Sequence, residues 1–273
     1  MPTYAYFAFV VVAISWIVRN KARLLSIQRA IGGILGDPLR FKGDTALSSE
    51  QRWAIAAGAD LAVRNGQFLD ALPTGLTHAH EILSTWWGIE SREDALDMLR
   101  HLAREGHRAS YQQVVTLVRG QPESQQRALI ERVAFDIEQP ELAETFETLL
   151  ASQRLLVDDG LLAADAAPPN LLAWDLGRLI NICRWCFDVG WLSEEECWRH
   201  ILPAADALQR EYDSWSELST AYVMGFVMWK GGDPDLEYGV LKSDRKLLLS
   251  DARSPWKRLA FSPVLLGGEL ARA

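Results

Sequence analysis

Cysteine is scarce in this chain, which has three in 273 residues: Cys183, Cys186 and Cys197. An odd and sparse set excludes a disulfide framework and fits a reducing compartment. Cys183 and Cys186 have the C-x-x-C spacing, but the local pattern places both thiols on the apolar side of a helix, away from its N-terminus. No second Cys or His pair follows at zinc spacing. We therefore interpret them as small core residues and predict no metal and no cofactor.

Five other patterns are missing. No segment shows sustained period-two alternation with β-branched residues, and no repeat period is found, so the sequence predicts an all-α fold. No Gly-x-Ser-x-Gly, phosphate loop or dinucleotide fingerprint occurs. The sequence therefore identifies no class of enzyme, and a non-enzymatic role is favoured.

Positive charge is low outside the N-terminal region. The chain carries a net charge of −8, of which residues 1–40 contribute +4 and the remainder −12. Phosphate binding needs a basic surface, so an acidic body argues against nucleic acid as a partner.

An apolar run is present at residues 4–18, with Ser15 as its one clearly polar residue. Arg19, Lys21 and Arg23 come directly after it, and the positive-inside bias then places the C-terminal body in the cytoplasm. We interpret residues 1–35 as a membrane anchor with a basic flank, residues 36–47 as a linker and residues 48–273 as one all-α domain. The expected location is a bacterial inner membrane, crossed once. A buried helix of a soluble core is the alternative, because 15 residues are few for a membrane span.

Helix starts and stops recur along the body. Ser48 with Gln51, Ser193 with Glu196, and Ser214 with Glu217 have the capping-box spacing. Glycines follow several predicted helices, among them Gly88 and Gly106. The pattern predicts ten helices and a last short turn along the body, beginning with an Ala-rich helix that runs from Ser48 to Asn65.

The predicted helix 171–189 has one unusual face. One face gathers Leu and Ile side chains and forms a core face. The opposite face carries Trp174, Arg178, Asn181, Trp185 and Asp188, where a surface helix would carry Lys and Glu. Two interpretations remain open: a pocket or partner surface built on a rigid helix, or a second packing layer.

Polar residues near this helix suggest a second hypothesis. Asp175 and Arg178 are three residues apart and can pair along the helix. His107 and Arg108 follow a helix stop at Gly106, where they could meet an anion or cap a helix. If His107, Arg108, Asp175, Arg178 and Asn181 converge on one pocket, the protein is an enzyme of unrecognised class.

Several of these residues also carry a family resemblance. The relevant stretches are Trp86–Ile89 with Ser91–Glu93, Gly106–Arg108, Ala173–Arg178 with Asn181, Arg184 and Trp185, Ser214–Trp215, and Tyr222–Trp229. Together they resemble the bacterial domain of unknown function family numbered 1266, from about Gln51 to Trp256. The resemblance implies no particular activity. It adds Arg92, Arg184 and Trp215 to the candidate site.

These observations favour a membrane-tethered interaction module that binds a protein partner through the Trp-rich face. The enzyme with a polar pocket around His107, Asp175 and Arg178 is the first alternative. A toxin-neutralising or secretion-accessory protein is the second.

Overall fold

The fold is helical throughout in the computed structural model, which describes residues 37–43, 46–233 and 235–261. Within these ranges the only strand-like feature is an isolated bridge between Arg40 and Phe68. The all-α prediction is confirmed. The helices are α2 (Ser49–Ala57), α3 (Ala59–Arg64), α4 (Ala79–Trp87), α5 (Arg92–Arg104), α6 (Arg108–Val118), α7 (Glu123–Asp136), α8 (Glu141–Asp158), α9 (Leu172–Asp188), α10 (Glu194–Glu211), α11 (Trp215–Trp229), α12 (Leu236–Ser250) and α13 (Pro255–Arg258).

The proposed anchor, residues 4–18, lies outside the described ranges. Among the helices that the structure does describe, none is both long enough and apolar enough to span a bilayer. Part of the expected linker packs on the body. Leu39 is buried, and the backbone N–H groups of Lys42 and Gly43 donate to the Asp70 carboxylate.

Two of the three expected capping boxes form in full, at Ser48 and at Ser193. In each, the serine hydroxyl accepts the N–H three residues on, and the Gln or Glu side chain accepts the serine N–H. Ser214 accepts the N–H of Glu217 in the same way, but the Glu217 carboxylate accepts from Asp213 instead of Ser214.

The expected helix from Ser48 to Asn65 is wrong in one respect, because it is broken at Gly58 into α2 and α3. The Gly58 carbonyl accepts a hydrogen bond from Asn181 Nδ2 at 2.9 Å. A β-carbon at Gly58 would lie 2.9 Å from that same nitrogen. Glycine therefore permits the close approach of α9 at the break.

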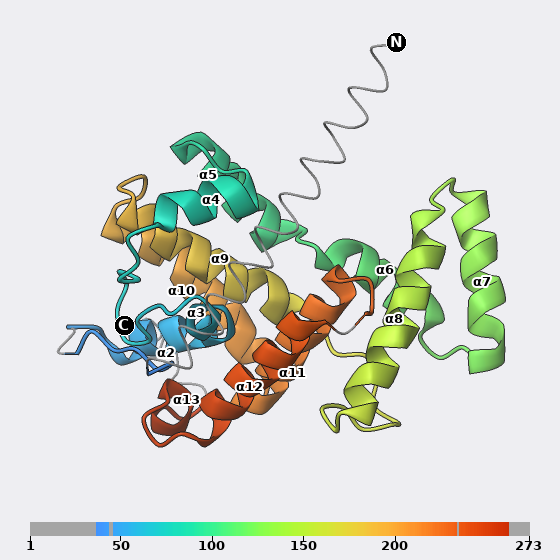
Figure 1. Ribbon diagram of the computed structural model, residues 1–273. Coiled ribbons are helices and arrows are strands. Elements are labelled where there is room, and N and C mark those ends of the chain that lie inside the picture. Colours follow the sequence, from blue (N-terminus) through green and yellow to red (C-terminus); the bar gives the residue numbers. More distant parts are fainter. Residues whose placement is uncertain (1–36, 44–45, 234, 262–273) are drawn as a thin grey trace, which may run out of the picture. The chain divides into compact units, whose positions relative to one another are not determined.

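Helix α9 is the centre of the body (Figure 1). It packs against α2, α3, α4, α5, α6, α10 and α11. Every residue from Ala173 to Cys186 is buried. The helix thus has no solvent face over these four turns, and the second packing layer is the correct interpretation of its unusual side.

Helices α7 and α8 form an antiparallel pair at the edge of the body, next to α6 (Figure 1). Helix α8 packs against α6 and α11, whereas α7 packs against α6 and α8. The turn that joins α7 to α8 passes through Glu138, whose φ of +56° is the left-handed conformation that glycine usually adopts.

Candidate functional site

The Asp175 carboxylate on α9 is the centre of the polar cluster. It is fully buried, and it accepts the backbone N–H groups of His107 at 3.0 Å and Arg108 at 3.1 Å. These two residues begin α6, whose first N–H groups have no partner within the helix. Asp175 therefore caps α6 from another helix, where its negative charge also favours the helix dipole.

Arg108 joins three helices at this point. Its Nη1 donates to Asp175 Oδ2 and to the Leu102 carbonyl, both at 2.8 Å. Its Nη2 donates to the carbonyls of Ala103 and Arg104. These are among the last carbonyls of α5. The Arg108 guanidinium therefore caps the C-terminal end of α5, while Asp175 caps the N-terminal end of α6.

Arg178 and His107 complete the cluster. Arg178 Nη2 lies 2.6 Å from Asp175 Oδ1 and 2.9 Å from His107 Nδ1. An arginine can only donate, so His107 Nδ1 is the acceptor in this hydrogen bond. The guanidinium also lies over the ring of Trp174, 4.0 Å from its centroid.

The charges of the cluster determine the state of Asp175. Burial raises the pKa of its carboxyl, but the hydrogen bonds from His107 and Arg108 and the Arg178 charge outweigh burial, so the pKa lies below its usual value. A carboxylate held in its charged form by this many donors is a poor proton acceptor. Four of the five residues expected to converge in an enzyme do lie together. Their contacts with Asp175, however, join α5, α6 and α9.

Asn181 does not join this cluster, contrary to the expectation. Its Nδ2 donates to the carbonyls of Gly58 and Gly177. Arg184 lies a further turn along α9 and donates to the carbonyls of Phe68, Ala71 and Leu72, which fixes the loop before α4. Both side chains donate to backbone carbonyls, while Asn181 Oδ1 and Arg184 Nη1 are buried without a hydrogen-bond partner.

The aromatic side of α9 is not available to a partner. Trp174 is 5% exposed and Trp185 is 1% exposed. Trp174 packs against Tyr222 and Phe226 of α11, and Trp185 lies near Trp87 of α4. The expectation of a docking face here is wrong, because other helices already cover it.

Two further candidates lie in separate surroundings. Trp215 stacks on Trp256 with ring centroids 5.6 Å apart, and its Nε1 donates to the Leu259 carbonyl. Arg92 forms an ion pair with Glu196, which links the first turns of α5 and α10. The proposed set of ten residues is therefore several structural contacts and not one site.

The cysteines are core residues. All three are buried as free thiols, and the Cys197 Sγ donates to the Cys183 carbonyl. Burial raises the pKa of Cys186 and Cys197 to about 12. No group of three or more His, Cys, Asp or Glu side chains suited to a metal ion occurs in the described part of the chain.

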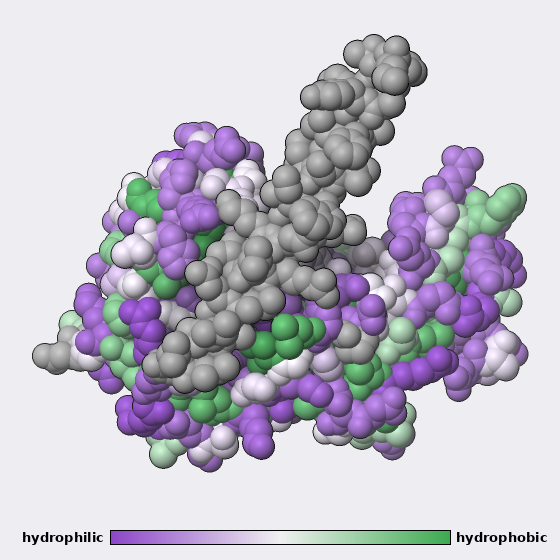
Figure 2. Space-filling model, viewed as in Figure 1, coloured by the Kyte–Doolittle hydropathy of each residue, from purple (hydrophilic) through white to green (hydrophobic). Residues whose placement is uncertain are grey.

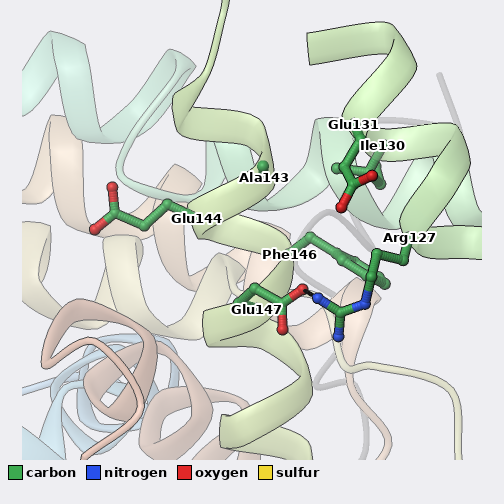
Figure 3. Close-up of a pocket in the computed structure, with 7 residues that line it drawn as sticks. All are labelled: Arg127, Ile130, Glu131, Ala143, Glu144, Phe146 and Glu147. Carbon is green, nitrogen blue, oxygen red and sulfur yellow. Dashed lines mark hydrogen bonds and ion pairs between the residues drawn. The ribbon is translucent and has the colours of Figure 1, made fainter. Parts of the chain in front are cut away.

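A cavity of about 230 Å³ lies between α7 and α8 (Figure 3). It is smaller than the roughly 300–1,000 Å³ of ordinary small-molecule pockets. The residues that line it are Arg127, Ile130, Glu131, Ala143, Glu144, Phe146 and Glu147. Ile130 and Phe146 are buried and give it an apolar floor, while Arg127 pairs with Glu147 at its edge.

Sequence reasoning missed a second buried carboxyl group, that of Asp60 on α3, which is 1% exposed. The residue stands among alanines, and an acidic residue in an Ala-rich helix is usually on the solvent side. Its burial depends on α11 and α12, more than 150 residues later in the chain, so no local pattern could have indicated it.

The fold and these contacts define an all-helical domain organised around one buried polar helix. The chain belongs to the family described as Protein of unknown function (DUF1266), whose family model matches residues 82–261. The match begins some thirty residues later than the resemblance noted from the sequence, and it includes α9 and the Asp175 cluster. No curated protein and no solved structure matches this chain.

Proposed function

We propose that this protein is an interaction module that binds a protein partner through the end of the α7–α8 hairpin. The observation that carries the proposal is Phe135, whose side chain is 84% exposed. Ile137, two residues on, is 44% exposed. Hydrophobic surface is visible at the free end of this hairpin in Figure 2. Large exposed apolar side chains at the end of a projecting element are typical of binding surfaces.

The charge around Phe135 indicates the chemistry of the partner. Residues 135–141 contain Asp136, Glu138 and Glu141, all of them exposed, and the nearest basic residue, Arg132, lies one turn earlier on α7. A partner segment that presents an apolar side chain between Lys or Arg residues complements this surface. A toxin-neutralising or secretion-accessory role would be a special case of such binding.

The binding surface can be tested by photocrosslinking in cells. A benzophenone amino acid at position 135 should capture one specific protein, whereas the same group at Leu236, which is 63% exposed on α12, should not. The captured peptide should contain Lys or Arg, and the triple variant Asp136→Asn, Glu138→Gln, Glu141→Gln should reduce the yield. Equal capture from positions 135 and 236, or a yield that is unchanged in the triple variant, would contradict the proposal.

We further propose that residues 4–18 hold this module at the inner membrane of a bacterium, with the helical body in the cytoplasm. The support is the apolar run and the basic residues directly after it. The full chain should stay in the membrane fraction after a carbonate wash. A variant with Val11→Asp and Ile14→Asp should be released, and release of the unaltered chain would refute the tether.

A further inference from the structure

A second buried polar cluster lies where α3, α11 and α12 meet. Asp60 of α3 is covered by neighbouring helices, and the Ser219 hydroxyl of α11 donates to its Oδ1 at 2.8 Å. The other carboxylate oxygen, Oδ2, is buried and has no hydrogen-bond partner. A buried charge without its full set of hydrogen-bond partners is strongly disfavoured, so burial favours the protonated, neutral form of Asp60.

Helix α12 brings two more charged groups to the same place. Asp244 Oδ2 and Arg245 Nε are both buried without a hydrogen-bond partner. The Arg245 Nη2 instead donates to Ser216 and Thr220 of α11. The guanidinium is thus within the cluster but bonded to hydroxyl and carbonyl oxygens, and it leaves both carboxyls without an ion pair.

The other charged groups around the cluster are already engaged or uncharged. Arg64 of α3 binds the carbonyl and the carboxylate of Glu237. From α11, Tyr222 interacts electrostatically with Asp60, Arg64 and, on α9, Arg178. From α12, Tyr238 bonds to Asp159, and Asp244 and Arg245 act on Asp60.

Both carboxyls therefore hold protons unusually tightly. Burial raises the pKa of Asp60 to about 7, and the nearby Asp244 adds to this, while Ser219 and Arg245 oppose it. Burial raises the pKa of Asp244 to about 6, against the charge of Arg64. The two groups change charge in the range between mildly acidic and neutral conditions.

We propose that Asp60 and Asp244 form a proton-operated latch that controls how firmly α12 is held against α3 and α11. When both carboxyls carry a proton, α12 is packed against α3 and α11, which is the closed state, and Arg245 stays bonded to Ser216 and Thr220. When they lose their protons, two negative charges that repel each other remain, each with an Oδ2 that is buried without a hydrogen-bond partner. Arg245 is then drawn from α11 toward the carboxylates, and the contacts of α12 loosen.

The direction of the effect follows from proton linkage. The closed state binds these protons more tightly than an open state in which the carboxyls have ordinary pKa values near 4. The stability of the closed state is therefore fully present below pH 4, falls as the pH rises and reaches its lower limit above about pH 7. Acidification within this range tightens α12.

Hydrogen–deuterium exchange of the full chain between pH 5 and 8 tests the latch, with each rate divided by its intrinsic rate. Protection of peptides from residues 236–250 should fall by up to about a hundredfold per pH unit below pH 6, where opening releases two protons, and by about tenfold per unit from pH 6 to 7, where it releases one. Peptides from α9 are the internal control and should not follow. In Asp60→Asn with Asp244→Asn, α12 should keep its acid-like protection at every pH.

Infrared spectroscopy supplies a readout that does not depend on the variants folding. The unaltered protein should show a protonated-carboxyl band at pH 6 that is lost by pH 8. Absence of that band at pH 6 would overturn the proposal. Three exchange results would also overturn it. The protection of α12 could be independent of pH, the protection of α9 could fall as much as that of α12, or the protection of α12 could still fall in a folded double Asn variant.

Discussion

Gly106 lies directly against the carboxylate of Asp175. A β-carbon at Gly106 would overlap Oδ2 and Cγ of that side chain, and the glycine has a φ of +64°. Two independent constraints therefore act on this position: a left-handed backbone and a lack of space. Both arise because the chain between α5 and α6 folds tightly around a charge from α9.

Gly106→Ala should separate these two constraints when it is compared with Gly88→Ala. Gly88 has a similar φ of +62°, but a β-carbon there would meet nothing within 4 Å. We expect Gly88→Ala to cost about 1–2 kcal/mol from the backbone alone, and Gly106→Ala to cost about 1–3 kcal/mol more because of the overlap. Urea denaturation measures both. Equal losses would show that the carboxylate can move aside.

Asp175→Asn should lower stability strongly at neutral pH, because it leaves Arg108 and Arg178 without their buried counter-charge. Breaking a buried pair in this way costs about 3–5 kcal/mol. Asp97→Asn is a matched control, since Asp97 also pairs with an arginine three residues on, but with both side chains exposed. That change should cost less than about 1 kcal/mol. A small effect at Asp175 would contradict the role assigned to it.

Asp175 should also contribute to the loss of folding stability at acidic pH. The pKa of its carboxyl is lower in the folded protein than in the unfolded chain. The stability it contributes is therefore present above about pH 4 and is lost as the pH falls through the lowered value. Urea midpoints measured from pH 6 to pH 2.5 should fall less steeply in Asp175→Asn than in the unaltered protein. Parallel curves would exclude Asp175 as a source of acid sensitivity.

Two helix-interior glycines should respond to alanine with opposite signs. A β-carbon at Gly225 of α11 would overlap Cβ and Cγ of Trp174, whereas at Gly239 of α12 it would meet nothing. Gly239→Ala should raise stability by up to about 1 kcal/mol through helix propensity. Gly225→Ala should lower it, because α9 and α11 must separate. Thermal unfolding gives the sign directly, and stabilisation at both positions would contradict the tight contact.

The thiols should be unreactive while the protein is folded. Cys183, Cys186 and Cys197 are buried, and burial raises the pKa of each. A thiol reagent at pH 8 should label none of them in the native protein and all three in guanidinium chloride. Rapid labelling of Cys183 or Cys186 in the native state would reopen a redox interpretation of the C-x-x-C spacing.

Local sequence patterns were sufficient for most helix ends, because a capping serine or a left-handed glycine acts on its immediate neighbours. Ser48 and Ser193 are examples. The break at Gly58 was not predictable, because its cause is a side chain on α9, 123 residues away. A glycine within an alanine-rich stretch otherwise looks like a tolerated helix residue.

The polar cluster around Asp175 was predictable only in part, because its members come from separate helices. His107, Arg108, Asp175 and Arg178 were named together, and the structure brings them together. Whether they would form an open pocket or a closed junction depends on what else fills the space, and that is set by α4, α5 and α6. Asn181 lies on the same side of α9 as Arg178, yet its partner is Gly58, which no helical spacing reveals.

The burial of α9 on all sides has a consequence for how the protein is made. Helices α2 to α6 leave the ribosome before α9 has been synthesised, and each of them packs against it. The surfaces that they turn toward α9, and the α6 end that Asp175 caps, therefore have no native partner until translation has passed Asp188. The nascent N-terminal half must stay soluble for that interval, and it is then that chaperone binding and aggregation compete with folding.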